Sequence, residues 1–158
     1  MVQTRLAQVS DAPELKKLND LFNGKNSAVV ETIKKSLIEN TQEIVCVAVK
    51  NNGDTSSLVG FCCGQIIKSM CYTILYGDIT EFFVIDGYRN TDVGELLIKQ
   101  IELEFGKRGV NHLHHLIGKD NIPMQELYIS LGYANSSKSS YGSSSIIIFE
   151  KDTDKQTE

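Results

Sequence analysis

The sequence lacks the long apolar segments that a membrane-spanning protein needs. No uninterrupted apolar run reaches 18 residues, and a transmembrane helix is therefore excluded. The first residues, Met1 to Ala7, also lack the apolar stretch of a secretory signal. We expect a cytoplasmic protein with no membrane partner.

The sequence also has no excess of positive charge. Sixteen Lys and Arg residues stand against 20 Asp and Glu residues, a formal net charge of −4. Contacts to nucleic-acid phosphates need clustered Lys and Arg, so we expect no nucleic-acid partner. An acidic surface is compatible with a cationic substrate such as an amine.

Metal-binding patterns are absent or incomplete. The four cysteines form no C-x-x-C pair, and all of them fall in segments that the pattern predicts as strands. Adjacent Cys62 and Cys63 would point to opposite faces of a strand, which favours free thiols over a shared metal. His112 and His114 would share one strand face and His115 the other, with no obvious fourth ligand. We interpret these histidines as ordinary strand lining and expect no metal.

The composition that remains is typical of one globular domain. The chain has 158 residues, of which 41% are hydrophobic and 23% charged, and a second core is not expected. We predict a single domain over residues 1–151 and a polar tail over residues 152–158.

Apolar periodicity predicts a mixed α/β order. After a first strand near Thr4, helices are predicted over residues 10–23, 27–40, 93–105 and 123–131. Further strands are predicted over residues 44–49, 58–67, 79–85, 112–117 and 146–149. The first two of these form a hairpin, so part of the sheet is antiparallel. The serine-rich residues 136–145 are predicted to form a loop.

The most informative stretch covers residues 79–97, where a strand runs into a short loop that ends at a helix N-terminus. Such a place offers unpaired backbone N–H groups and the positive end of a helix dipole. Both suit a phosphate or pyrophosphate group.

Two blocks in this region resemble the GCN5-related N-acetyltransferase (GNAT) family. The family loop reads Arg/Gln-x-x-Gly-x-Gly/Ala, and this chain has Arg89-Asn90-Thr91-Asp92-Val93-Gly94. About thirty residues later, the segment from Asn121 to Tyr133 is similar to the family's Asn-x-x-Ala-x-x-x-Tyr-x-x-x-Gly-Phe/Tyr pattern. The resemblance implies a mixed, mostly antiparallel central sheet flanked by helices on both faces.

The resemblance also implies acetyl-CoA as cosubstrate and assigns residues to it. The strand backbone would pair with the pantetheine arm, the loop backbone would hold the pyrophosphate, and two residues of the second block would lie beside the cofactor. These residues are Phe82, Phe83 and Val84 on the strand, Arg89, Asn90, Thr91, Asp92, Val93, Gly94 and Glu95 in the loop, and Asn121 and Met124 in the second block.

Two side chains are candidates for the chemistry. By resemblance, Tyr128 would protonate the departing CoA thiolate, whereas by position alone it could be an amphipathic core residue. The resemblance also makes Glu81, on the central strand, the best candidate base, acting directly or through water. It could equally be a structural carboxylate paired with Arg89 or a lysine. Thr80, expected on the opposite strand face, is the fallback for holding a water.

The main departure from the family pattern is Asp92, which stands where the family has glycine. A side chain and a negative charge there would oppose a bound pyrophosphate. We therefore weigh two functions: transfer of an acetyl group from acetyl-CoA to the primary amine of a small molecule, and a catalytically silent ligand- or partner-binding domain of the same fold. An exposed strand over residues 146–149 would suit a homodimer built by edge-strand pairing.

Overall fold

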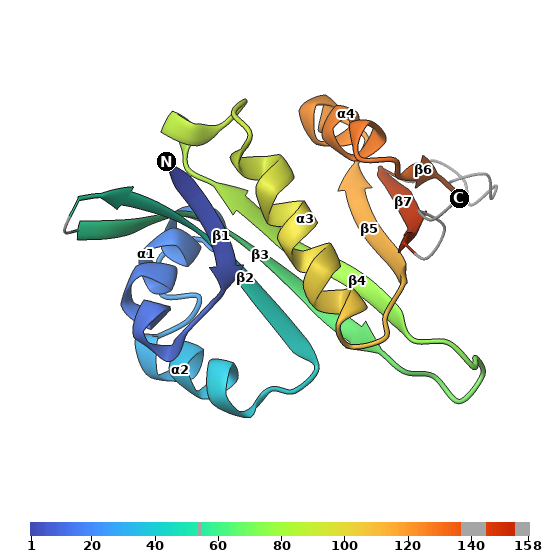
Figure 1. The fold of residues 1–158 in the computed structure, drawn as a ribbon, viewed down its shortest axis with the longest axis horizontal. Helices are drawn as coiled ribbons and strands as arrows, with labels where there is room; N and C mark the ends of the chain where they lie inside the picture. Colours follow the sequence, from blue (N-terminus) through green and yellow to red (C-terminus); the bar gives the residue numbers. More distant parts are fainter. Residues whose placement is uncertain (54, 137–144, 154–158) are drawn as a thin grey trace.

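A seven-stranded sheet forms the centre of the computed structural model, which describes residues 1–53, 55–136 and 145–153 (Figure 1). The strand order is β1-β2-β3-β4-β5-β7-β6, and every neighbouring pair is antiparallel except β4 and β5. The strands are β1 (Val2–Leu6), β2 (Glu43–Asn52), β3 (Thr55–Ile67), β4 (Tyr76–Val84), β5 (His112–Gly118), β6 (Ala134–Asn135) and β7 (Ile146–Asp152). The helices are α1 (Ala12–Asn23), α2 (Val30–Glu39), α3 (Val93–Gly106) and α4 (Ile122–Ser130), with 3-10 turns η1 (Val9–Asp11) and η2 (Asp86–Tyr88).

The helices cover both faces of the sheet because side chains alternate along each strand. On β2, Cys46 and Ala48 belong to the core cluster under α3, while Val47 and Val49 belong to the cluster under α1. Tyr128 of α4 lies in the α3 cluster, so α3 and α4 share a face. The predicted fold class, a mostly antiparallel sheet with helices on both faces, is confirmed.

Several boundaries differ from the sequence prediction. The second helix begins at Val30 rather than near residue 27, because Val29 is still extended. Cys71 lies exposed in the β3–β4 connection and not in a strand. Strand β7 reaches Asp152, one residue into the predicted tail. Most of the predicted serine-rich loop, residues 137–144, lies outside the described residues.

The short strand β6 is absent from the sequence prediction and changes the position of β7 in the sheet. Ala134 pairs with Glu150 and Asn135 with Phe149, so β7 lies between β5 and β6. The interpretation of residues 146–149 as an exposed edge strand is therefore wrong at Phe149, which pairs with β6.

Strands β4 and β5 are hydrogen-bonded over four residue pairs and then separate. Their register runs from Tyr76 opposite His112 to Ile79 opposite His115. Figure 1 shows the two strands diverging toward their C-terminal ends, near the N-terminus of α3. Within the described residues, the second half of β4 therefore has β3 on one side and no strand on the other.

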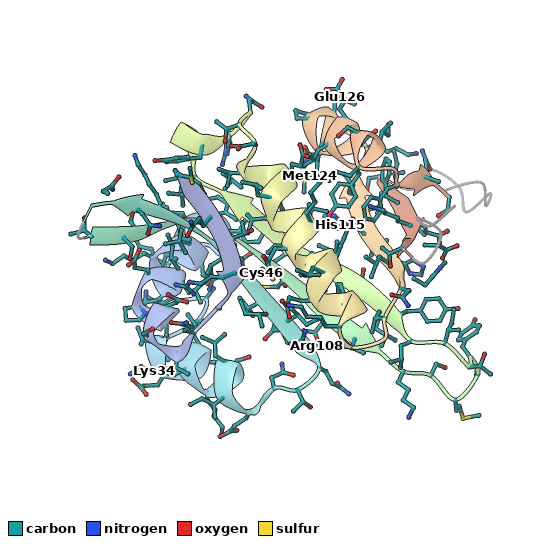
Figure 2. All side chains as sticks on the ribbon, viewed as in Figure 1. Lys34, Cys46, Arg108, His115, Met124 and Glu126 are labelled. Carbon is teal, nitrogen blue, oxygen red and sulfur yellow. The ribbon has the colours of Figure 1, made fainter. Side chains whose placement is uncertain are left out.

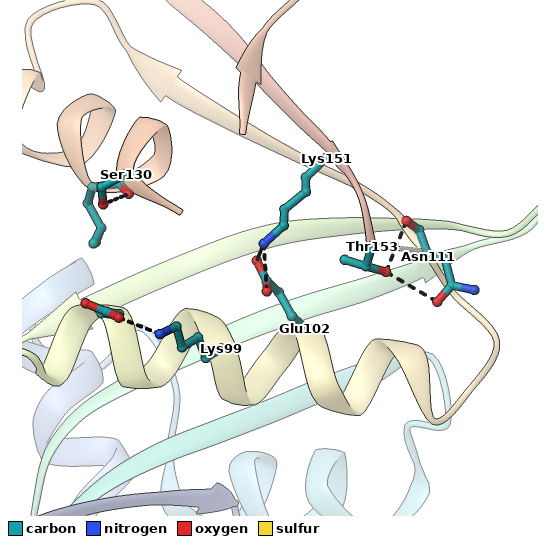
Figure 3. Close-up of polar contacts among 8 residues, drawn as sticks. Lys99, Glu102, Asn111, Ser130, Lys151 and Thr153 are labelled. Atoms are coloured by element: carbon teal, nitrogen blue, oxygen red, sulfur yellow. Dashed lines mark hydrogen bonds and ion pairs between the residues drawn. The ribbon is translucent and has the colours of Figure 1, made fainter. Parts of the chain in front are cut away.

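Helix α3 is tied to the last strand by a largely buried ion pair (Figure 3). Lys151 Nζ lies 2.9 Å and 3.0 Å from the two carboxylate oxygens of Glu102. Thr153 follows β7 and donates its hydroxyl to the backbone oxygen of Asn111 at 3.3 Å. The ion pair holds β7 against α3, and the Thr153 hydrogen bond ties the end of β7 to the residue before β5. In the described part of the chain, no helix is both long and apolar enough to cross a membrane.

Candidate functional site

The loop between β4 and α3 has a backbone shape that suits an anion. Asn90 is left-handed with φ of 60°, a conformation that Asn tolerates better than most residues. The Thr91 hydroxyl donates to the Tyr88 carbonyl at 2.6 Å and accepts from the Val93 amide at 3.4 Å. Thr91, and not Asp92, therefore makes the capping contact at the start of α3.

Several backbone amides of this loop point away from the rest of the described structure. Among the described residues, the backbone N–H groups of residues 90–92, 94 and 95 donate no intramolecular hydrogen bond. They gather at the N-terminus of a 14-residue helix, where the helix dipole is positive. Unpaired amides at a helix N-terminus have the geometry that suits an anion.

A hollow of about 710 Å³ begins at this loop. It collects nine of the twelve residues predicted to contact a cofactor, from three separate segments of the chain. These nine are Phe82, Phe83, Val84, Arg89, Asn90, Thr91, Gly94, Asn121 and Met124. We call this space the loop hollow. Leu21, Phe22, Tyr88, Pro123 and Leu127 complete its walls.

The other three predicted cofactor residues do not direct side chains into the loop hollow. Asp92 is exposed and makes no side-chain capping bond. Val93 is 1% exposed and belongs to the core under α3. The Glu95 carboxylate accepts a hydrogen bond from Lys99 at 2.5 Å. Asp92 and Glu95 can therefore serve a ligand in the loop hollow through their backbone amides, whereas the Val93 amide already donates to the Thr91 hydroxyl.

The diverging half of β4 supplies a second set of backbone groups. The Ile85 amide donates to the Val59 carbonyl of β3. Because bonded and non-bonded residues alternate in an antiparallel ladder, Phe83 also bonds with β3, and Phe82 and Val84 face the other way. The Val84 carbonyl accepts from Arg89 Nε at 3.1 Å. This leaves the backbone groups of Phe82 and the amide of Val84 facing the gap.

Helix α4 closes the loop hollow from the opposite side. Asn121 begins this helix and accepts from the Met124 amide at 3.3 Å. Figure 2 shows Met124 close to the first turns of α3. A Cβ at Gly94 would lie 3.2 Å from Leu127 Cδ2 and 3.4 Å from the Phe82 ring. Glycine at this position therefore allows α3, α4 and β4 to approach one another.

Tyr128 is buried beside the loop hollow and does not line it. Its side chain is 0% exposed, and its ring packs against His115 of β5 at 4.8 Å and Tyr133 at 4.6 Å. Its hydroxyl has no hydrogen-bond partner among the described residues. Burial, and then the nearby Cys62 thiol, raises the pKa of Tyr128 well above its usual range. The phenol therefore stays protonated and can act as a donor.

The His115 imidazole beside Tyr128 is neutral at physiological pH. Burial lowers the pKa of His115 to about 4, because a buried site disfavours the charged form. Its Nδ1 has no partner among the described residues. Figure 2 shows His115 between α3 and β5, where the β4–β5 pairing ends.

Glu81 lies in a second hollow, on the α1 and α2 side of the sheet. This space measures about 260 Å³, and we call it the helix hollow. Helices α1 and α2 supply walls of mixed apolar and uncharged polar side chains, and three strands supply the floor with Glu43, Val45, Phe61, Cys63 and Glu81. The two carboxylates are the charged side chains that line it.

A bulge in β4 positions Glu81. Cys63 pairs with Glu81 and Gly64 with Ile79, so Thr80 has no partner on β3. The Thr80 hydroxyl donates to the Glu81 carboxylate. The alternation that placed Thr80 on the opposite face therefore does not hold here, and Thr80 orients Glu81 instead.

The alternative role of Glu81, a structural carboxylate paired with Arg89 or a lysine, has no support among the ion pairs of the described residues. Arg89 pairs with Asp86 at 2.9 Å, and no ion pair among the described residues includes Glu81. Glu81 is half-buried in the wall of the helix hollow. This position leaves the carboxylate available to a ligand.

Three aromatic rings stand where the two hollows meet. Phe22 and Phe83 line the loop hollow, and Phe61 lines the helix hollow. The ring centroids are 5.5 Å apart for Phe22–Phe83, 5.9 Å for Phe22–Phe61 and 6.0 Å for Phe61–Phe83. The two hollows therefore adjoin across one aromatic cluster.

Sequence reasoning missed several residues of the site. Phe22 near the end of α1 and Glu43 at the start of β2 belong to no sequence motif. The signal that could have identified Glu43 is a negatively charged residue directly before the apolar run of residues 44–49. Its carboxylate accepts from Ser36 Oγ at 2.7 Å and from Gln65 Nε2 at 3.3 Å, contacts that pattern alone does not reveal.

The residues present fit the cofactor that the resemblance implies. The unpaired amides suit a pyrophosphate, and the diverging β4 edge suits an extended arm with amide groups. Asp92, the position in doubt, turns its side chain out of the loop hollow. The donor set and the shape of the loop hollow therefore agree with acetyl-CoA.

The comparisons with known proteins agree with this geometry. A family model described as the Acetyltransferase (GNAT) family matches residues 15–133. Because the match covers more than half of the chain, the protein belongs to the GNAT acetyltransferase family. A search of curated protein sequences gave no match.

Solved structures show the same fold at low sequence identity. A GNAT-family acetyltransferase from Streptococcus pneumoniae is 19% identical, with a TM-score of 0.75 and coverage of 96% of this chain and 99% of that one. Arabidopsis thaliana NAA60 in complex with acetyl-CoA is 15% identical, with a TM-score of 0.73 and coverage of 98% and 99%. An aminoglycoside acetyltransferase from an uncultured soil sample, in complex with sisomicin, is 17% identical, with a TM-score of 0.69 and coverage of 83% and 87%.

Proposed function

We propose that this protein transfers the acetyl group of acetyl-CoA to the primary amine of a small molecule. The observation that carries the proposal is the adjacency of two hollows of different character. The loop hollow ends at unpaired helix amides, and the helix hollow contains the Glu81 carboxylate. A donor and an acceptor would meet between them, beside the aromatic cluster.

The loop hollow would hold the cosubstrate. The unpaired amides of residues 90–92, 94 and 95 would bind the pyrophosphate, and Arg89 would add a positive charge at the same end. The backbone of Phe82 and the amide of Val84 would pair with the pantetheine arm as an added strand does. Asn121 and Met124 would line the arm from α4. Bound there, acetyl-CoA supplies the acetyl group as a thioester.

Glu81 would remove the proton from the attacking amine. An amine with a pKa of about 10.4 is neutral in roughly one molecule in 2,500 at pH 7, and only the neutral form has a lone pair to attack with. A carboxylate that accepts the proton, directly or through water, therefore speeds the reaction. The Thr80 hydroxyl would hold the Glu81 carboxylate in place.

Tyr128 would return a proton to the leaving sulfur. Its hydroxyl is buried, protonated and without a partner among the described residues, which is the state that a hydrogen-bond donor to a thiolate needs. Its ring is fixed between His115 and Tyr133.

The size and charge of the helix hollow support a small amine. A space of about 260 Å³ is large enough for a short aliphatic or aromatic amine and small for a folded protein surface. The carboxylates of Glu43 and Glu81 would attract a cationic head group. The apolar residues of α1 and α2 would cover its hydrocarbon part.

The first experiment is a calorimetric titration of the full chain with acetyl-CoA, followed by a CoA-release assay on a panel of amines and short peptides. Micromolar binding and turnover with a small amine would support the proposal. Binding without turnover on any amine, or turnover on peptides alone, would contradict the small-molecule assignment.

The second candidate, a catalytically silent domain, is favoured by Asp92 in the loop and by Met124, which could crowd the arm of the cofactor in the loop hollow. A carboxylate about 5 Å from a pyrophosphate charge would cost about 1 kcal/mol in water-like surroundings and about 3 kcal/mol at an effective dielectric of 20. These energies correspond to roughly 5- to 150-fold in affinity. Because Asp92 is exposed, the lower figure applies.

Asp92→Gly distinguishes the two candidates. We expect the variant to bind acetyl-CoA about fivefold more tightly than the natural chain, with both showing turnover. An inert natural chain whose Asp92→Gly variant gains binding would establish the silent domain.

A homodimer remains a prediction for this chain. The outer edge of β1 would be available for strand pairing. Light scattering on the purified protein measures the mass directly, and a monomer at high micromolar concentration would contradict the prediction.

A further inference from the structure

A cluster of histidines and carboxylates lies on the sheet face opposite α3, away from the loop hollow. His112 and His114 are two residues apart on β5, so their side chains lie on the same face. The intervening Leu113 is fully buried in the core under α3. The two imidazoles are half-buried, and their ring centroids are 4.9 Å apart.

Strand pairing surrounds these histidines with acidic residues. His114 stands opposite Asp78 of β4 on one side and opposite Glu150 of β7 on the other. His112 stands opposite Asp152 of β7. Side chains directly opposite in a sheet lie about 5 Å apart at Cβ. Three carboxylates therefore flank two imidazoles on one patch of the sheet.

The spacing within the patch is that of ligands around one ion. The donor atoms of His112, His114 and Glu150 all lie within 4.8 Å of one another. His114 Nε2 is 3.5 Å from the Glu150 carboxylate. Two ligands at about 2.1 Å from a tetrahedral ion stand about 3.4 Å apart. The observed separation matches that value and is long for a good hydrogen bond.

A buried nitrogen in the patch has no hydrogen bond to account for its position. Nε2 of His114 is shielded from solvent and makes no hydrogen bond among the described residues. Burying a polar atom without a hydrogen-bond or metal partner costs folding free energy. Its direction toward Glu150 is explained if a cation lies between them.

The rings are already held in place by their neighbours. The Asp152 carboxylate contacts Nδ1 of His112, and an acidic partner of this kind fixes a ligating imidazole and raises its basicity. The Tyr76 ring packs against both histidines, with centroid distances of 5.1 Å and 5.4 Å. An ion would therefore bind with little rearrangement.

We propose that His112, His114 and Glu150 bind one divalent transition-metal ion of the zinc class. Asp152 orients His112, and Asp78 or a water molecule supplies the fourth position. Two imidazoles and a carboxylate favour Zn²⁺, Co²⁺ or Ni²⁺ over the all-oxygen preferences of Ca²⁺ and Mg²⁺. This site is independent of the proposed acetyl transfer. It replaces our interpretation of these histidines as ordinary strand lining.

The proposal is tested on the tag-free full chain after dialysis against a chelator. Calorimetric titration with ZnCl₂ should give one site, and Co²⁺ should produce the visible absorption of a four-coordinate ion. Glu150→Gln keeps the side-chain volume and should weaken Zn²⁺ binding at least about tenfold, as should His114→Ala. Asp152→Asn should weaken it by about 10- to 100-fold.

Two control variants make the test specific. Cys63→Ser alters the other group of potential ligands, Glu43, Cys63 and Glu81, and should leave Zn²⁺ binding unchanged. Glu126→Gln removes a remote charge on α4 and should do the same. No binding by the natural chain, binding that survives Glu150→Gln, or binding lost in Cys63→Ser would overturn the proposal. The Co²⁺ spectrum of the natural chain decides the matter if a histidine variant fails to fold.

Discussion

Glu81 is positioned by an irregularity in β4 that a strictly alternating strand would not provide. The bulge at Thr80 places a hydroxyl against the carboxylate at the wall of the helix hollow. The Glu81→Gln variant measures how much the carboxylate would contribute to the proposed catalysis. It should leave the fold undisturbed, because Gln has nearly the same volume as Glu.

Glu81→Gln should lower the acetylation rate by about 10²- to 10⁴-fold at pH 7, the range that one positioned proton acceptor contributes. Acetyl-CoA binding should be unchanged, since Glu81 lies outside the loop hollow. A steady-state assay paired with calorimetry checks both. Glu126→Gln, on the exposed face of α4, serves as control, and an unchanged rate in Glu81→Gln would assign the base elsewhere.

Tyr128→Phe should affect the stability of the protein and its turnover in different directions. The hydroxyl is buried without a partner among the described residues, and an unsatisfied buried donor costs about 1–3 kcal/mol. Its removal should leave the free energy of unfolding unchanged or raise it by up to that amount, while kcat falls. Chemical denaturation and the CoA-release assay measure the two effects. A marked loss of stability would indicate that the hydroxyl has a structural partner.

Helix α3 ends in a charged cluster that fixes its last turn. The Glu104 carboxylate is 4% exposed and accepts from Lys107 at 2.7 Å and from Arg108 at 2.8 Å. Burial alone would raise the pKa of Glu104, but the hydrogen bonds from Lys107 and Arg108 outweigh it and lower that pKa below its usual value. The carboxylate is therefore more stable charged in the folded protein than in the unfolded chain.

Because folding lowers the pKa of Glu104, the loss of stability in Glu104→Gln should depend on pH. A lowered pKa adds stability above the unfolded pKa of about 4.3, and this stability is lost as the pH falls through the folded value. The variant should be less stable by about 1.5–3 kcal/mol at pH 7, and the difference should shrink below pH of about 4. Urea denaturation at pH 7, 5 and 3.5 measures it, and a difference that does not change with pH would contradict the account.

The sequence predicted the elements that carry strong local signals. The amphipathic spacing of residues 93–105 and the motif from Arg89 to Gly94 located α3 and its loop, and nine predicted cofactor residues meet in the loop hollow. Strand β6 has two residues and no periodicity, so no pattern could reveal it. The bulge at Thr80 depends on pairing with β3, which a single strand's sequence does not encode.

The proposed metal site also depends on strand pairing, which the sequence pattern of a single segment does not reveal. Glu150 and Asp78 are far from His114 in sequence and become its neighbours only because β4 and β7 flank β5. The alternation of His112 and His114 against His115 was predicted and is confirmed. The acidic partners could not be identified without the strand order.

For the whole molecule, acetyl-CoA should act as a stabilising ligand. A ligand that binds only the folded state adds about 2.7 kcal/mol at a concentration of 100 times its Kd. For a domain of about 150 residues, each kcal/mol raises Tm by roughly 2–4 °C, so an increase of about 5–11 °C is expected. Scanning calorimetry with and without acetyl-CoA measures it. Desulfo-CoA should stabilise comparably, and no increase with either ligand would contradict binding in the loop hollow.

The four-residue contact between β4 and β5 divides the sheet into two antiparallel ladders, β1–β4 and β5–β7–β6. Local opening in proteins follows such cooperative units. Backbone amides of β5 and β7 should therefore exchange with deuterium through openings that leave the larger ladder closed, and the Lys151–Glu102 ion pair and the shared core under α3 should oppose these openings. A ligand seated across the gap would join the two ladders and slow that exchange. The gap between β4 and β5, where we propose that the cofactor binds, is therefore also where we expect local unfolding to begin.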